Sequence, residues 1–148
     1  MRANFGAEIL DTAWALIEPA AKRGTVQITA TSATIRNGRV SAKISDIYTQ
    51  NGHVEFYRHV GDKTTPILSE QNYVVGAHNP GTRVFRDMSR GLSHIEQHFA
   101  ARDGERFYGM GLNATGRVNL KGSVIDLYQR HVKHVVPFLV SSEGYGFL

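Results

Sequence analysis

At 148 residues with 41% hydrophobic content, the chain is long enough for one well-buried core and too short for two ordinary domains. The formal net charge of +4 comes from dispersed basic residues that form no basic run, which argues against a nucleic-acid surface. The absence of cysteine excludes disulfides and thiolate chemistry and is typical of a reducing compartment, so we expect a cytoplasmic protein.

The N-terminal segment, residues 1–20, has a short apolar stretch interrupted by Glu8, Asp11 and Glu18. It therefore matches neither a signal peptide nor a bilayer span, and we expect no membrane contact. The stretch from Phe5 to Ile17 also fits a helical stripe. Irregular structure followed by a strand near Trp14 is the interpretation we favour.

The first clear strand runs from Thr25 to Ala30, where apolar and polar residues alternate, and the alternation predicts that it is half buried. Asn37-Gly38 then precedes a second alternating run, Val40 to Ile44. Because Asn and Gly tolerate positive φ, this pattern predicts a hairpin with a type I′ turn.

Turn signals continue at regular intervals. Asn51-Gly52 precedes Val54, and Gly61-Asp62 precedes Ile67. A turn about every 10 to 14 residues is the rhythm of antiparallel sandwiches and barrels.

The middle of the chain is less regular, with a turn predicted at Asn79-Pro80-Gly81 and a strand from His94 to Phe99. Farther on, Val135 to Val140 is apolar on both faces, which predicts a central buried strand. Pro137 fits such a strand only at a bulge or at its start. We therefore predict an all-β, antiparallel β-sandwich that forms a single domain over residues 1–148.

The chain ends at Gly144 to Leu148 in apolar sequence without a polar tail. Such an ending is unusual for a natural domain, so we expect a truncated fragment of a longer protein.

Seven histidines suggest a metal site, with His94 and His98 four residues apart and His131 and His134 three apart. The zinc-protease pattern fails, because Ile95 follows His94 where a glutamate is needed and the segment alternates like a strand. We therefore predict neither a metal nor a cofactor, and expect exposed or locally hydrogen-bonded histidines.

Gly109-Met110-Gly111 with Ala114 formally matches a dinucleotide fingerprint, but its β surroundings cannot present a helix N-terminus. We interpret these glycines as turn and bulge positions. The sequon Asn113-Ala114-Thr115 has meaning only in a secreted protein, which nothing in the sequence supports.

The sequence has no recognisable nucleophile for covalent catalysis, because Ser141-Ser142 is not flanked by the glycines of a nucleophile elbow. Glycosidase chemistry needs two carboxylates in different environments, and spacing alone cannot pair the available acids. Those acids are Glu96, Asp103, Glu105, Asp126 and Glu143. The late aromatics could stack on sugars, although core packing is the commoner role of such residues on strands. They are Phe107, Tyr108, Tyr128, Phe138, Tyr145 and Phe147.

Three segments in order carry a family resemblance: Glu105 to Gly111, then Leu120-Lys121-Gly122, then Val136 to Leu148. Together they resemble the N-terminal domain of glycoside hydrolase family 31, which holds α-glucosidases and α-xylosidases. The resemblance implies a galactose mutarotase-like sandwich that precedes a catalytic (β/α)₈ barrel, expected downstream and absent from this chain. The family's aspartate nucleophile and acid/base lie in that barrel, so this chain should hold no catalytic residue.

The resemblance also implies that a loop of this domain helps to shape the pocket mouth. Gln129, His131 and Lys133 are the substrate-binding residues that it suggests. Gln129 and Arg130 fit the family pattern, whereas His131, Val132 and Lys133 replace its usual residues. Leu112-Asn113 likewise stands where the family usually continues with glutamate or glutamine.

The main hypothesis is thus a non-catalytic domain of an enzyme that hydrolyses terminal α-glucosides or α-xylosides with retention. Its expected partners are its own downstream barrel, an α-linked carbohydrate, and a second copy through an exposed apolar face. One alternative is a free-standing sugar mutarotase or epimerase, with Glu96 and His94 or His98 exchanging protons with the sugar. A carbohydrate-binding module is the other.

Overall fold

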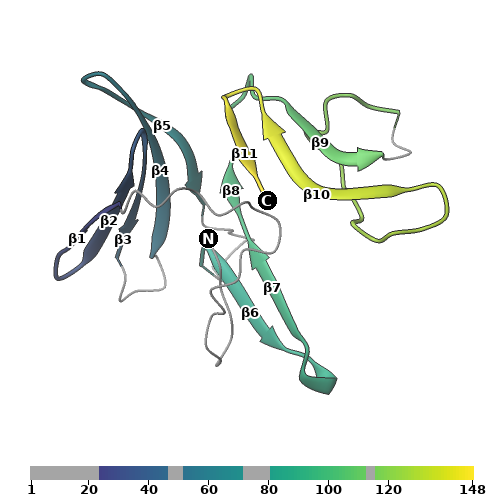
Figure 1. Ribbon diagram of the computed structural model, residues 1–148. Helices are drawn as coiled ribbons and strands as arrows, with labels where there is room; N and C mark the ends of the chain where they lie inside the picture. Colours follow the sequence, from purple (N-terminus) through teal and green to yellow (C-terminus); the bar gives the residue numbers. More distant parts are fainter. Residues whose placement is uncertain (1–23, 47–51, 72–80, 113–115) are drawn as a thin grey trace. The chain divides into compact units, whose positions relative to one another are not determined.

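The computed structural model describes residues 24–46, 52–71, 81–112 and 116–148, which divide into two compact units at Ala100 and Ala101 (Figure 1). Apart from one 3₁₀ turn, every regular element in these ranges is a strand, and every strand pair is antiparallel. This confirms the all-β, antiparallel prediction. None of the described residues form a helix that could cross a membrane. The predictions for Phe5 to Ile17, Asn51 and Asn79-Pro80 lie outside the described residues.

The first unit contains a six-stranded sheet in the order β1-β2-β3-β4-β5-β8. Its strands are β1 (Thr25–Ile28), β2 (Ser32–Asn37), β3 (Val40–Ser45), β4 (His53–Val60), β5 (Lys63–Glu70) and β8 (Phe99–Ala100). Two-residue loops that begin with a glycine of positive φ join β2 to β3 and β4 to β5, at Gly38 (φ 57°) and Gly61 (φ 56°). The hairpin at Asn37-Gly38 is confirmed. Its turn differs from the prediction, because Gly38 is the only residue of that turn with positive φ, as in a type II′ turn.

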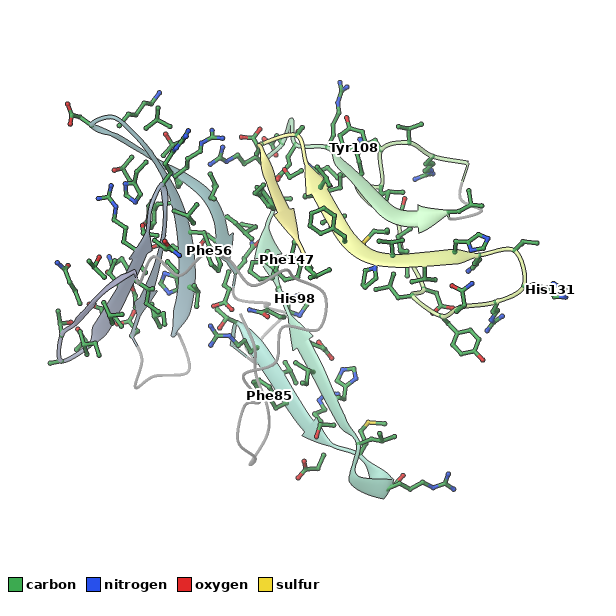
Figure 2. All side chains as sticks on the ribbon, viewed as in Figure 1. Phe56, Phe85, His98, Tyr108, His131 and Phe147 are labelled. Atoms are coloured by element: carbon green, nitrogen blue, oxygen red, sulfur yellow. The ribbon has the colours of Figure 1, made fainter. Side chains whose placement is uncertain are left out.

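The alternation in the sequence becomes one apolar and one polar face of this sheet. Residues directly opposite each other share a face, and the register pairs Val26 with Ile35, Ile35 with Ala42, and Ala42 with Phe56. The same face carries Ile28, Ala33, Ile44, Val54 and Leu68. Val54 is its most buried member at 4% exposed, and Phe56 is marked in Figure 2.

Burial at the start of the sheet differs from the prediction. Thr25–Ile28 does form a strand, but all four residues are exposed, with Ile28 at 76%. The alternation selects a face but cannot provide a covering layer. Among the described strands, β1 stands at the end of the sheet and has one neighbour. The neighbouring β2 escaped prediction because Ile35 is its only large apolar residue.

The first unit also contains a two-stranded hairpin, β6 (Arg83–Asp87) and β7 (Ser93–Gln97), with a short 3₁₀ turn at Ser89–Gly91. The predicted strand from His94 to Phe99 is thus confirmed in outline, divided between β7 and β8.

One buried carboxylate, that of Glu70, joins this hairpin to the six-stranded sheet. The Glu70 side chain is fully buried and accepts a hydrogen bond from the Val54 backbone N–H (2.6 Å). It also accepts bonds from both Arg83 Nε (2.8 Å) and Arg83 Nη2, and from Gln97 Nε2. A buried carboxylate is tolerated only when it is paired and hydrogen-bonded. Glu70 therefore fixes where β6 and β7 lie against β4 and β5.

The second unit is a three-stranded sheet with β10 (His134–Ser141) between β9 (Phe107–Leu112) and β11 (Tyr145–Phe147). The central position of β10 is confirmed, and so is the placement of Pro137, because the β9 register shifts between Val135 and Leu139. The predicted burial of β10 is wrong, since Phe138 is 42% exposed. Leu139 faces residues 120–125, whereas Phe138 points to the opposite side of the strand.

Two glycines in β9 allow the backbone of the bulged strand β10 to approach β9 closely. A Cβ on Gly109 would lie 2.4 Å from the Phe138 carbonyl oxygen, and one on Gly111 would lie 1.9 Å from that of His134. Both glycines and the intervening Met110 have positive φ. Their interpretation as bulge positions is therefore confirmed.

A second buried carboxylate, that of Glu105, holds the start of β9 to the β10–β11 hairpin. Glu105 is 2% exposed and accepts hydrogen bonds from the Ser141 hydroxyl, the Tyr145 hydroxyl (2.7 Å) and the Arg102 backbone N–H (3.0 Å). Burial opposes its ionisation, but these donors outweigh that effect and hold the pKa of Glu105 below its ordinary 4.5. Burial and the bond to Glu105 raise the pKa of Tyr145 to about 12.

Replacing Glu70 by glutamine should destabilise the first unit by about 2–3 kcal/mol, because Arg83 and the Val54 N–H lose a charged acceptor. Chemical denaturation followed by circular dichroism measures this loss. The matched control is Glu55→Gln, since within the described part of the chain Glu55 accepts a side-chain bond only from Tyr57 (2.9 Å) and the change should alter stability by less than about 1 kcal/mol. Equal losses in the two variants would contradict the role of Glu70.

Gly111→Ala should destabilise the second unit far more than Gly122→Ala. Both glycines have positive φ, at 81° and 74°, so both variants bear the same backbone strain. A Cβ meets the His134 carbonyl only at Gly111, and it meets nothing within 4 Å at Gly122. Thermal unfolding of the two variants compares them, and equal midpoints would show that the close approach to β10 is absent.

The bond between Glu105 and Tyr145 predicts pH dependence at both extremes. Glu105 has a lowered pKa, so its stabilisation is complete above about pH 4.5 and is lost as the pH falls through the folded pKa. Tyr145 has a raised pKa, so its stabilisation is complete below pH 10 and is lost towards about pH 12. Tyr145→Phe should reduce the alkaline loss, to which Tyr57 with its raised pKa still contributes, and should lower stability at neutral pH by about 1.5 kcal/mol. Urea unfolding across pH tests this, and an unchanged alkaline profile in the variant would refute it.

Candidate functional site

The predicted substrate-binding residues lie on the loop that leads into β10 in the second unit. Gln129 is exposed, but its side chain is bound to the loop's own backbone. Its Nε2 donates to the Lys133 carbonyl, and its Oε1 accepts from the Val135 N–H at 3.0 Å. The Lys133 N–H in turn donates to the Arg130 carbonyl at 2.7 Å. Gln129 therefore braces the two sides of the loop.

Most of the remaining side chains of this loop are exposed. His131 lies at the turn and points away from the sheet in Figure 2. The Arg130 guanidinium lies 5.1 Å from the centre of the Tyr128 ring, a cation–π contact on a side chain that is 60% exposed. Lys133 is half buried. The structure thus brings Gln129 and Lys133 together through a backbone contact, with His131 at the tip.

A second group of predicted residues meets at strand β7 of the first unit. His94 and Glu96 lie on β7, two residues apart and so on one face of the strand, and His98 follows the last residue of β7. Glu96 Oε1 lies 2.7 Å from His94 Nε2, and Glu96 Oε2 lies 3.5 Å from His98 Nε2. The hydrogen bond from His94 is the main reason that the pKa of Glu96 is lowered, and His98 and Arg86 lower it further. Figure 2 marks His98.

Such a carboxylate between two imidazoles can exchange protons with a ligand, which is the chemistry that the mutarotase alternative requires. All three side chains are part-exposed, two of them on the β6–β7 hairpin and that of His98 directly after it. Within the described ranges, no group of three His, Cys, Asp or Glu residues has an arrangement that could hold a metal ion.

The other acids named from the sequence lie in the second unit. Glu143 pairs with the Arg102 guanidinium, and Glu105 is bound as described above. Asp103 and Asp126 are exposed. The sequon Asn113-Ala114-Thr115 falls outside the described residues.

Sequence reasoning missed a hollow of about 360 Å³ in the second unit. Its walls come from the strand residues Phe107, Met110 and Leu139 and from the segment Leu120, Lys121, Gly122, Ser123 and Ile125. The floor is mostly apolar, and Lys121 directs its ammonium to the Arg102 and Asp103 carbonyls. The motif Leu120-Lys121-Gly122 was the signal available, since it belongs to the family resemblance.

Comparison with known proteins bears directly on these arrangements. Residues 2–148 match the model of the glycosyl hydrolase 31 N-terminal galactose mutarotase-like domain. An uncharacterised family 31 glucosidase from Pseudescherichia vulneris is 30% identical over 161 aligned positions, which cover 100% of this chain and 30% of that protein. An α-xylosidase from Saccharolobus solfataricus is 38% identical over 64 positions, covering 37% of this chain and 9% of its own length.

Solved structures agree. A family 31 α-xylosidase from a soil metagenome, in complex with xylose, matches with a TM-score of 0.73 and 28% identity, over 94% of this chain and 22% of its own. The family 31 α-xylosidase of Xanthomonas citri matches with a TM-score of 0.67 and 31% identity, over 85% and 12%. The chain thus spans less than a third of the length of these relatives. It belongs to the family of N-terminal galactose mutarotase-like domains of glycosyl hydrolase family 31.

Proposed function

We propose that this chain is the non-catalytic N-terminal domain, a single β-sandwich over residues 1–148, of an enzyme that hydrolyses terminal α-xylosides or α-glucosides with retention. The observation that carries the proposal is the family match over residues 2–148, together with relatives named glucosidase and α-xylosidase that are more than three times longer. Retaining hydrolysis needs two carboxyl groups about 5–5.5 Å apart on a rigid frame. We assign that pair to the part of the enzyme beyond this chain.

The role of Glu105 supports a structural function. A catalytic acid needs a raised pKa and access to the substrate. Glu105 has a lowered pKa, is 2% exposed, and uses its oxygens on Ser141, Tyr145 and Arg102. The carboxylate within the family's first signature segment therefore serves the fold.

The proposed partner is a downstream (β/α)₈ barrel. Both units expose apolar side chains that a packing partner could cover. They include Ile35 and Val40 in the first unit and Phe138 and Val140 in the second. Self-association through such a face is a further proposed contact, and the cysteine-free composition supports a cytoplasmic location.

An α-linked sugar is the proposed ligand of the loop before β10, with His131 and Lys133 facing it. The two hydrogen bonds of the Gln129 side chain to the loop backbone support a fixed loop conformation. Gln129 therefore positions the loop, in addition to any contact that it makes with the sugar itself. Tyr128, exposed beside Arg130, offers an aromatic surface to the same sugar.

The purified chain should leave 4-nitrophenyl α-xyloside and α-glucoside intact, whereas the enzyme extended to the length of its relatives should cleave at least one of them. Release of 4-nitrophenol measures both. Cleavage by the chain alone at an enzymic rate would refute the proposal.

The contact of His94 and Glu96 favours one second candidate, sugar mutarotation, and a separate assay decides it. Optical rotation of fresh α-glucose should relax with the chain as it does in buffer. An acceleration that disappears in Glu96→Gln would establish the mutarotase instead.

A further inference from the structure

The outer edge of β1 differs from the other strand edges in the described ranges. Protein sheets protect their edges from pairing with another chain by short strands, charges, proline or bulges. β8 and β11 are two and three residues long, β9 lies opposite the bulge in β10 and has three consecutive residues of positive φ, and the β6–β7 hairpin carries charged residues along both strands. β1 reads Thr-Val-Gln-Ile; at four residues it is longer than β8 and β11, and it carries no charge, no proline and no bulge.

The hydrogen-bond pattern shows which groups of β1 face outward. The Thr29 N–H donates to the Ser32 carbonyl at 2.8 Å, so this pair closes the β1–β2 hairpin as a hydrogen-bonded pair. Such pairs alternate along an antiparallel ladder, which makes Gln27 opposite Thr34 the next one. The N–H and C=O groups of Val26 and Ile28 therefore point away from β2, at an edge where no described strand pairs with them.

We propose that a second copy of this chain pairs with β1 in antiparallel fashion, across a two-fold axis at Gln27. Val26 then exchanges both backbone hydrogen bonds with the partner's Ile28, and Ile28 does the same with the partner's Val26. Val26 and Ile28, which are 58% and 76% exposed, meet as β-branched cross-strand pairs on one face. Gln27 lies opposite its own copy on the other face.

The edge is thus self-complementary, as a closed two-fold contact requires. A four-residue strand buries little surface, so the dimer is weak and forms at high protein concentration. The contact is independent of the proposed glycosidase role, because none of its residues belongs to the loop before β10 or to the His94–Glu96–His98 group.

Sedimentation equilibrium from micromolar to millimolar chain should show a monomer–dimer equilibrium. Gln27→Lys places two like charges opposite each other and should lower the association constant roughly threefold or more. Val26→Pro removes an outward N–H while leaving the β1–β2 ladder intact, and should lower it at least roughly fivefold. The matched control is Gln71→Lys, the same change at an exposed position after β5, which should leave association unchanged.

Amide hydrogen exchange provides a readout that general destabilisation would not reproduce. Protection at Val26 and Ile28 should rise with chain concentration, whereas protection at Gln27, bonded within the sheet, should not. The proposal is overturned if the chain is monomeric throughout, or if Val26 and Ile28 exchange alike at all concentrations. It is equally overturned if Gln27→Lys and Val26→Pro associate as strongly as the unmodified chain.

Discussion

Both units of this domain depend on a buried carboxylate that must be supplied with donors from distant parts of the chain. Glu70 collects its donors from β4, β6 and β7, and Glu105 collects them from the hairpin of β10 and β11. Because an unsatisfied buried charge is far less stable than a paired one, each carboxylate allows one arrangement of the strands around it. Few side chains in the described residues are buried apolar ones, so this constraint carries much of the specificity.

The sequence predicted what depends on neighbouring residues. Alternation located β1, β3 and β4, Asn37-Gly38 located one hairpin, Gly61-Asp62 marked a further turn, and Pro137 marked the bulge in β10. Burial was predicted badly for β1 and β10, because hydrophobic pattern selects a face whereas burial needs a second layer. The roles of Glu70 and Gln129 could not be predicted either, since their partners are defined by tertiary folding and by a loop's backbone. His94 and Glu96 did meet, because strand periodicity alone brings them to one face of β7, and His98 lies beside Glu96 just after that strand.

The described residues of the family signature in this chain therefore have structural roles. Glu105 anchors the second unit, and the absence of side chains at Gly109 and Gly111 leaves room for the carbonyl groups of β10. Leu120 is buried, with 8% of its surface exposed, and lines the apolar hollow. The two glycines and Glu105 fix how β9 packs against β10 and how the start of β9 is held to β11.

The side-chain pKa of Glu105 tests this account most directly, by carbon-detected NMR titration of its carboxyl group in the intact chain. The structural role predicts a value below the ordinary 4.5, because an ionised carboxylate is what Ser141, Tyr145 and the Arg102 N–H stabilise. A value above 4.5 would mean that burial outweighs these donors and favours the protonated carboxyl, the direction expected of an acid catalyst, and would contradict the claim that Glu105 serves the fold.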